Sequence, residues 1–162
     1  MNARNEKLAV LAYPMHGHRK LVTEGYRTRD GHVIEWLARL LDQQGAVGVY
    51  SRPEPAGLDW IKLKRASRRS TDPANAVFFD SPVVRVPSLR DRFAWWSKSA
   101  ASYPVPAGAP ETPAIVWNPF VSVSSATPAL FDERRTNVFD LLDDWTIHYA
   151  FEGIRPQVDE AY

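Results

Sequence analysis

The chain has 162 residues, of which 44% are hydrophobic, and this size suits a single domain with one core. Its 20 Lys and Arg residues nearly balance 19 Asp and Glu residues, so no global positive field favours binding to nucleic acid or to an anionic membrane. There is no cysteine, which excludes disulfides, thiolate metal sites and cysteine nucleophiles and favours a cytoplasmic location.

The first third of the sequence predicts a strand, a long loop, a helix and a second strand. Residues 8–13 are continuously apolar, which is typical of a strand buried on both faces of a parallel sheet, and too short to cross a membrane. Residues 14–31 carry two histidines and three glycines without periodicity, so we expect a loop there. Helical spacing of apolar residues predicts a helix over 32–44, and residues 46–51 form the next expected strand.

The rest of the chain continues the alternation of strands and helices. A helical rhythm resumes at Thr146 and is expected to end at Pro156. We therefore predict an α/β fold, a single three-layer Rossmann-like domain over residues 1–162 with a mainly parallel sheet and helices on both faces. The further expected strands are 76–79, 83–86, 114–117 and 138–142, and the further expected helices are 89–101 and 125–134.

Polar side chains follow three of the predicted strands. Because ligands of open α/β sheets bind in the crevice beyond the carboxyl ends of the strands, these three chain segments should share one site. The candidate acceptor- or substrate-binding residues are His16, Gly17, His18, Arg19, Asn118, Asp143, Asp144 and Trp145.

These strand ends resemble the acceptor-side, N-terminal domain of GT-B type glycosyltransferases, in particular a bacterial group with a Tyr- or Phe-Asp-x-x-Asp-Asp strand. The similar segments are the basic, glycine-containing loop after the first strand, Asn118-Pro119, and the run from Phe139 to Asp144. The resemblance extends from about Leu8 to Phe151. It implies two Rossmann-like domains that face a cleft, the first binding the acceptor and the second the nucleotide sugar. The C-terminal donor-binding domain would be absent here, and the chain would be inactive alone.

The resemblance also implies substrates and roles. The complete enzyme, a hexosyltransferase of polysaccharide biosynthesis, would move a sugar from a nucleotide-sugar co-substrate to a saccharide or lipid-linked acceptor. This domain alone would bind no cofactor and no metal. The segment from His16 to Arg19 would supply positive charge, and Gly17 a backbone conformation closed to other residues. Asp143 and Asp144 would accept hydrogen bonds from sugar hydroxyls, with Trp145 as a stacking surface. A homodimer and a peripheral contact with the inner face of the membrane stay open.

Each of these features also has a simpler structural explanation. Asp143 or Asp144 could cap a helix, and Asn118 could belong to a turn that ends a strand. The two loop histidines could contact only water. The cations from Lys62 to Arg69 fit a solvated loop better than a nucleic-acid site.

Two other classes of function remain alternatives. One is a non-catalytic α/β ligand-binding or assembly domain that uses the same edge of the sheet. The other is a metal-dependent hydrolase built on His16, His18, Asp143 and His148. The sequence contains no Gly-x-Ser-x-Gly elbow, no phosphate loop and no dinucleotide fingerprint.

Overall fold

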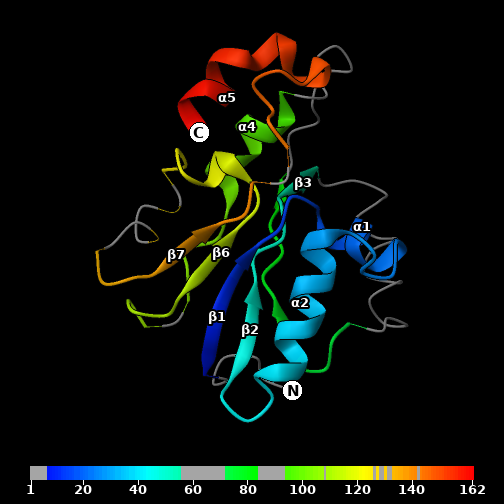
Figure 1. Cartoon of the computed structure of the whole chain (residues 1–162), viewed down its shortest axis with the longest axis vertical. Helices are drawn as coiled ribbons and strands as arrows, with labels where there is room; N and C mark the ends of the chain where they lie inside the picture. Colours follow the sequence, from blue (N-terminus) through cyan, green and yellow to red (C-terminus); the bar gives the residue numbers. More distant parts are fainter. Residues whose placement is uncertain are drawn as a thin grey trace.

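A parallel β-sheet forms the centre of the molecule (Figure 1). The computed structural model describes residues 7–55, 72–83, 94–107, 109–125, 127, 130, 133–141 and 143–162. Within these residues the main sheet has five strands in the order β4-β2-β1-β6-β7, and every neighbouring pair is parallel. The strands are β1 (Leu8–Tyr13), β2 (Ala46–Val49), β4 (Ala76–Phe78), β6 (Ala114–Val116) and β7 (Asn137–Phe139).

The strand order is that of a Rossmann-type sheet. From β1 the chain adds β2 and β4 on one side and then returns to add β6 and β7 on the other. Leu11 lies at the centre of this arrangement, in register with Gly48 of β2 and with Ala114 of β6. The order therefore reverses between β1 and β6, and ligands of such sheets bind beyond the carboxyl ends of the strands at this point.

Two hydrophobic clusters cover the two faces of the sheet, because successive residues of a strand point to opposite sides. Val10 and Ala12 belong to one cluster, together with α1 (His18–Thr23) and α2 (Arg29–Leu40). Leu11 and Tyr13 belong to the other, which contains buried residues of η2 (Ala100–Ser102), η3 (Pro119–Val121), η5 (Tyr149–Ile154) and α5 (Arg155–Ala161), with Trp96 of α4 (Trp95–Ser99) packed against it. The predicted α/β fold with helices on both faces is confirmed.

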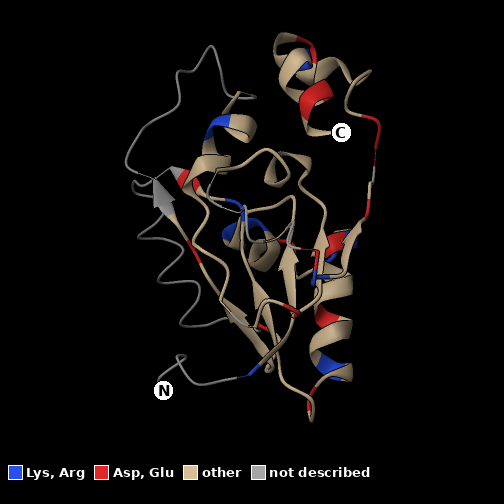
Figure 2. Cartoon of the chain, turned by 90° about the vertical axis from the view of Figure 1, so that its left-hand side faces the viewer, with Lys and Arg blue, Asp and Glu red and all other residues tan. Residues whose placement is uncertain are grey.

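The C-terminal part of the chain lies beyond the carboxyl ends of the strands. Figures 1 and 2 show α2 along one face of the sheet, whereas the helix at the C-terminus lies past its carboxyl edge. A second, two-stranded parallel sheet pairs β3 (Glu54–Pro55) with β5 (Pro82–Val83). Among the described residues, no helix combines the length and the apolar character needed to cross a membrane.

Two predictions of local structure are wrong for identifiable reasons. Residues 14–31 are not one loop, because α1 forms inside this segment and α2 begins at Arg29. Thr28 sets that start, since its side chain caps the helix by accepting a hydrogen bond from Gly31 N. Pro156 does not end a helix but lies in the first turn of α5, where its missing N–H has no partner to lose.

The remaining predicted elements are confirmed in part. Five of the expected strands correspond to β1, β2, β4, β6 and β7, although most are shorter than expected. The helix expected over 89–101 is described only from residue 94 onward, where it forms α4 and η2. The cations from Lys62 to Arg69 and part of the helix expected over 125–134 lie outside the described residues.

Candidate functional site

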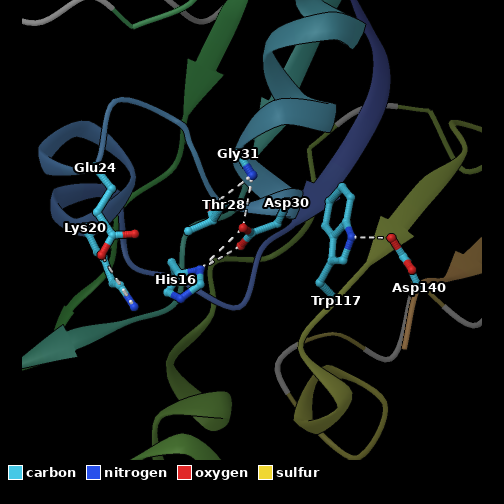
Figure 3. Close-up of polar contacts among 8 residues, drawn as sticks. All are labelled: His16, Lys20, Glu24, Thr28, Asp30, Gly31, Trp117 and Asp140. Carbon is cyan, nitrogen blue, oxygen red and sulfur yellow. Dashed lines mark hydrogen bonds and ion pairs between the residues drawn. The ribbon is translucent and has the colours of Figure 1, made fainter. Parts of the chain in front are cut away.

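A histidine–carboxylate pair lies at the point where the strand order reverses (Figure 3). His16 follows the end of β1, and its Nδ1 is 3.0 Å from Oδ2 of Asp30 in the first turn of α2. Asp30 is fully buried and also accepts a hydrogen bond of 3.0 Å from Gly31 N. Burial would raise the pKa of Asp30, but the hydrogen bonds from His16 and Thr28 outweigh it and hold the pKa below its usual value.

The charge of Asp30 determines what the imidazole can do. An ionised carboxylate only accepts hydrogen bonds, so Nδ1 of His16 carries the proton. Nε2 then keeps a lone pair whenever the ring is neutral, and within the described residues no hydrogen bond occupies it. The His16 side chain is 14% exposed, which leaves it accessible to a small molecule. A histidine oriented in this way is the usual arrangement of a general base.

His18 has a structural role instead. The side chain is 4% exposed, with Nδ1 2.8 Å from Asp80 and Nε2 3.2 Å from Asp72, and the ring stacks on Phe78. Burial lowers the pKa of His18, but its two carboxylate partners raise it more, to about 9. The ring is therefore a cation with both nitrogens bonded, and it ties α1 to the carboxyl end of β4.

The remaining loop candidates are placed differently from what the sequence indicates. Gly17 has φ −70°, which any residue can adopt, so the expected special backbone conformation is wrong. What distinguishes Gly17 is space, because an added Cβ would lie 2.1 Å from the side chain of Glu54. Arg19 is exposed on α1.

Asn118 lies inside the protein. It is fully buried two residues after the end of β6, where Nδ2 donates a hydrogen bond of 2.9 Å to the Tyr103 hydroxyl. Oδ1 accepts from Phe120 N and caps η3. Both polar groups of the amide are therefore used within the fold, as in the simpler explanation of a strand-ending turn.

The run Asp143-Asp144-Trp145 does not form the expected stacking site. Trp145 is 3% exposed, and its ring stacks on Phe151 with 4.5 Å between centroids. Asp144 accepts a hydrogen bond of 2.9 Å from Thr146 N, which is the behaviour of a local cap. The two carboxylates are exposed beside a shallow cavity of about 430 Å³, and no hydrogen bond or ion pair between described residues joins them to His16. The lining residues are Leu141, Asp143, Asp144, Thr146 and Tyr162.

Sequence reasoning missed a second carboxylate near the switch point. Asp140 directly follows β7 and accepts a hydrogen bond of 2.8 Å from Trp117 Nε1, as Figure 3 shows. Its other oxygen is 2.7 Å from Nη2 of Arg29, the first residue of α2. Asp140 thus joins the ends of β6 and β7 to the helix that carries Asp30.

Arg52 is a second residue that sequence reasoning missed. It follows β2, its backbone N–H donates to the carbonyl of His16, and its guanidinium lies 3.7 Å from the ring centroid of Trp96. Nε is buried without a hydrogen-bond partner. Burial lowers the pKa of Arg52, opposed by Tyr103 and Glu54. Stacking contributes about 0.5–2 kcal/mol, whereas a buried donor without a partner costs about 1–3 kcal/mol and more for a charged group. Stability alone does not explain this residue.

The proposed metal ligands are not brought together. Within the described ranges, no group of three or more His, Asp or Glu side chains could hold a metal ion. His16 and His18 bond to different carboxylates, and Nδ1 of His148 accepts a hydrogen bond of 3.1 Å from Ala150 N. The four residues of the hydrolase alternative therefore do not form one cluster.

Comparisons with known proteins give no information on the function of this chain. No protein-family model, no curated protein and no solved structure matches this chain. What the site offers is a buried carboxylate, an accessible imidazole nitrogen and an arginine without a carboxylate partner among the described residues, all at the carboxyl edge of a Rossmann-type sheet.

Proposed function

We propose that the chain is the acceptor-binding half of a glycosyltransferase, in which His16 is the general base. The observation that carries the proposal is the His16–Asp30 pair at the switch point of the sheet. Nδ1 is fixed by a buried carboxylate, and Nε2 is left to accept a proton. Of the segments that resemble acceptor domains of GT-B enzymes, the loop after β1, which carries His16, supports the same assignment.

The proposed step is a proton transfer coupled to sugar transfer. A hydroxyl of the saccharide or lipid-linked acceptor donates its proton to Nε2 of His16 while its oxygen bonds to the anomeric carbon of the donor. The bond from that carbon to the nucleoside diphosphate breaks, and the diphosphate leaves with the electron pair. The carboxylate of Asp30 stabilises the imidazolium that forms. The nucleotide sugar is held by a second domain, and the reaction takes place in the cytoplasm, at the inner face of the membrane when the acceptor is lipid-linked.

Acceptor binding can be tested on this chain alone. The measurement is an NMR titration of the histidine ring nitrogens with a panel of mono- and disaccharides. We expect a binding saccharide to shift the Nε2 signal of His16 and not that of His32, which is exposed on α2. A panel in which no saccharide shifts the His16 signal would refute the proposal.

Catalysis is tested in an assembly that also contains a donor-binding domain. There His16→Ala should lower kcat by about 10²–10⁴-fold with little change in the KM for the donor. His32→Ala is the matched control and should keep full activity. Saccharide binding with undiminished transfer by His16→Ala would remove the general-base role, and binding without any transfer would favour the non-catalytic ligand-binding alternative.

A further inference from the structure

Arg52 is a half-buried cation without a hydrogen-bond or ion-pair partner for its side chain among the described residues. Its Nε is buried and bonds to nothing, and no carboxylate within the described residues forms an ion pair with it. Glu54 is near enough to affect it electrostatically, but the Glu54 carboxylate packs against Gly17. The two terminal nitrogens form no hydrogen bond or ion pair with described residues.

Other cations of the described residues differ from Arg52 in this respect. Arg29 pairs with Asp140 at 2.7 Å, and Arg39 pairs with Glu35 at 2.6 Å. Arg135 also has a buried Nε without a partner, but its two terminal nitrogens donate hydrogen bonds to the carbonyls of Thr112 and Ala109. Arg52 therefore differs from these arginines in that its terminal nitrogens, as well as its buried Nε, have no partner among the described residues.

Among the described residues, no hydrogen bond or ion pair uses the N–H groups of the Arg52 guanidinium. Trp96 covers one face of the guanidinium plane, and a stacked ring does not use the N–H groups that lie in that plane. These N–H groups form a rigid fork that matches the two oxygens of a carboxylate or phosphate. Because the backbone of Arg52 is bonded to that of His16, the fork belongs to the same edge of the sheet as the proposed base.

We propose that Arg52 binds the anionic group of a small-molecule ligand at this edge, and that the acceptor is therefore an acidic saccharide with a carboxylate or phosphate group. The second half of this statement rests on the proposed transferase function, whereas anion binding by Arg52 does not. The oxygens of the anion accept hydrogen bonds from the guanidinium N–H groups of Arg52, which have no acceptor among the described residues.

The test compares three ligands that share one sugar ring. Glucuronate, glucose 6-phosphate and neutral glucose are titrated into the chain by calorimetry at constant ionic strength. We expect at least one of the two anions to bind at least about tenfold more tightly than glucose. Preference for glucuronate assigns a uronate-type acceptor, and preference for glucose 6-phosphate assigns a phosphorylated one.

Two variants make the residue assignment specific. Arg52→Gln should reduce anion affinity to the level of glucose, and Arg52→Lys, which keeps the charge without the fork, should give an intermediate affinity. Arg39→Gln is the matched control, since Arg39 also lies over an indole ring but is exposed and already paired. The anion affinity of the Arg39→Gln variant should stay within about twofold of the anion affinity of the unmodified chain.

The proposal is overturned if neither anion binds better than glucose, or if Arg52→Gln binds as the control does. Should Arg52→Gln fail to fold, the Nε–Hε NMR signal of Arg52 in the unmodified chain decides. A shift on addition of the anion supports the assignment, and an unchanged signal at saturating anion refutes it. His16→Ala should retain anion binding, because Arg52 is unchanged in this variant. Anion binding by a chain whose complete assembly transfers no sugar would refute the proposed function and leave the anion site in place.

Discussion

Protonation of His18 should control the stability of the domain between neutral and alkaline pH. The imidazolium joins Asp72 and Asp80 while 4% exposed, which connects α1 to the end of β4. Its folded-state pKa is raised from 6.5 to about 9. A group whose pKa is raised on folding contributes its full stability below the unfolded pKa. That contribution is lost as the pH rises through the folded pKa.

The expected size follows from the shift. The difference between about 9 and 6.5 corresponds to about 3 kcal/mol, at 1.36 kcal/mol per pKa unit. The free energy of unfolding should therefore decrease by roughly 3 kcal/mol between about pH 6 and pH 9. The carboxylates stay ionised over this range, and the buried tyrosines Tyr13, Tyr26 and Tyr103 have raised pKa values, so their ionisation belongs to a higher pH.

Urea denaturation at a series of pH values measures the effect. His18→Gln should be less stable at pH 6 and should lose most of the pH dependence. Asp80→Asn should reduce the dependence, because one of the two carboxylates that raise the pKa is gone. His32→Gln, at an exposed position, should behave as the unmodified chain does. If His18→Gln shows the same decrease between pH 6 and pH 9 as the unmodified chain, the reasoning is refuted.

Four further substitutions test other parts of the structure by denaturation, and for Asp144 also by saccharide binding. Thr28→Ala removes the cap of α2 and should cost about 1 kcal/mol, and an unchanged midpoint would show that the helix start does not depend on the hydroxyl. Gly45→Ala should cost about 1–3 kcal/mol, because φ is +143° and the new Cβ would approach Lys7 O to 2.4 Å. Gly17→Ala should cost less, since its φ is ordinary and only a movable side chain is in the way; equal losses at the two glycines would contradict this. Asp144→Ala should leave saccharide binding unchanged and lower stability slightly, and loss of binding would show that the exposed carboxylate contacts ligand.

The fold was accessible from the sequence because buried parallel strands have a simple pattern. Residues 8–13 are apolar without interruption, and the structure places β1 at the same bounds. The position of His16 followed from this strand. Asp30 did not, because its role depends on where α2 begins, and that start is set by the cap at Thr28 rather than by apolar periodicity.

The acidic run near the C-terminus shows a second reason why some site residues could not be predicted from the sequence. The sequence placed the end of the last strand at residue 142, whereas β7 ends at Phe139. Asp140, not Asp143, is therefore the first residue past the strand, and it bonds to Trp117 and Arg29. Trp145 also packs against Trp96, which is distant in sequence and which no local pattern connects to it.

The two members of the histidine–aspartate pair are joined through the hydrophobic core as well as directly. His16 continues from β1, and Asp30 lies one turn before Ile34, which is fully buried in the cluster that contains Val10 and Ala12. The width of this packed layer sets how far the imidazole is from its carboxylate. A cavity at Ile34 would therefore change the alignment of His16 and Asp30 before the protein unfolds, which makes the proposed proton transfer a sensitive report on core packing.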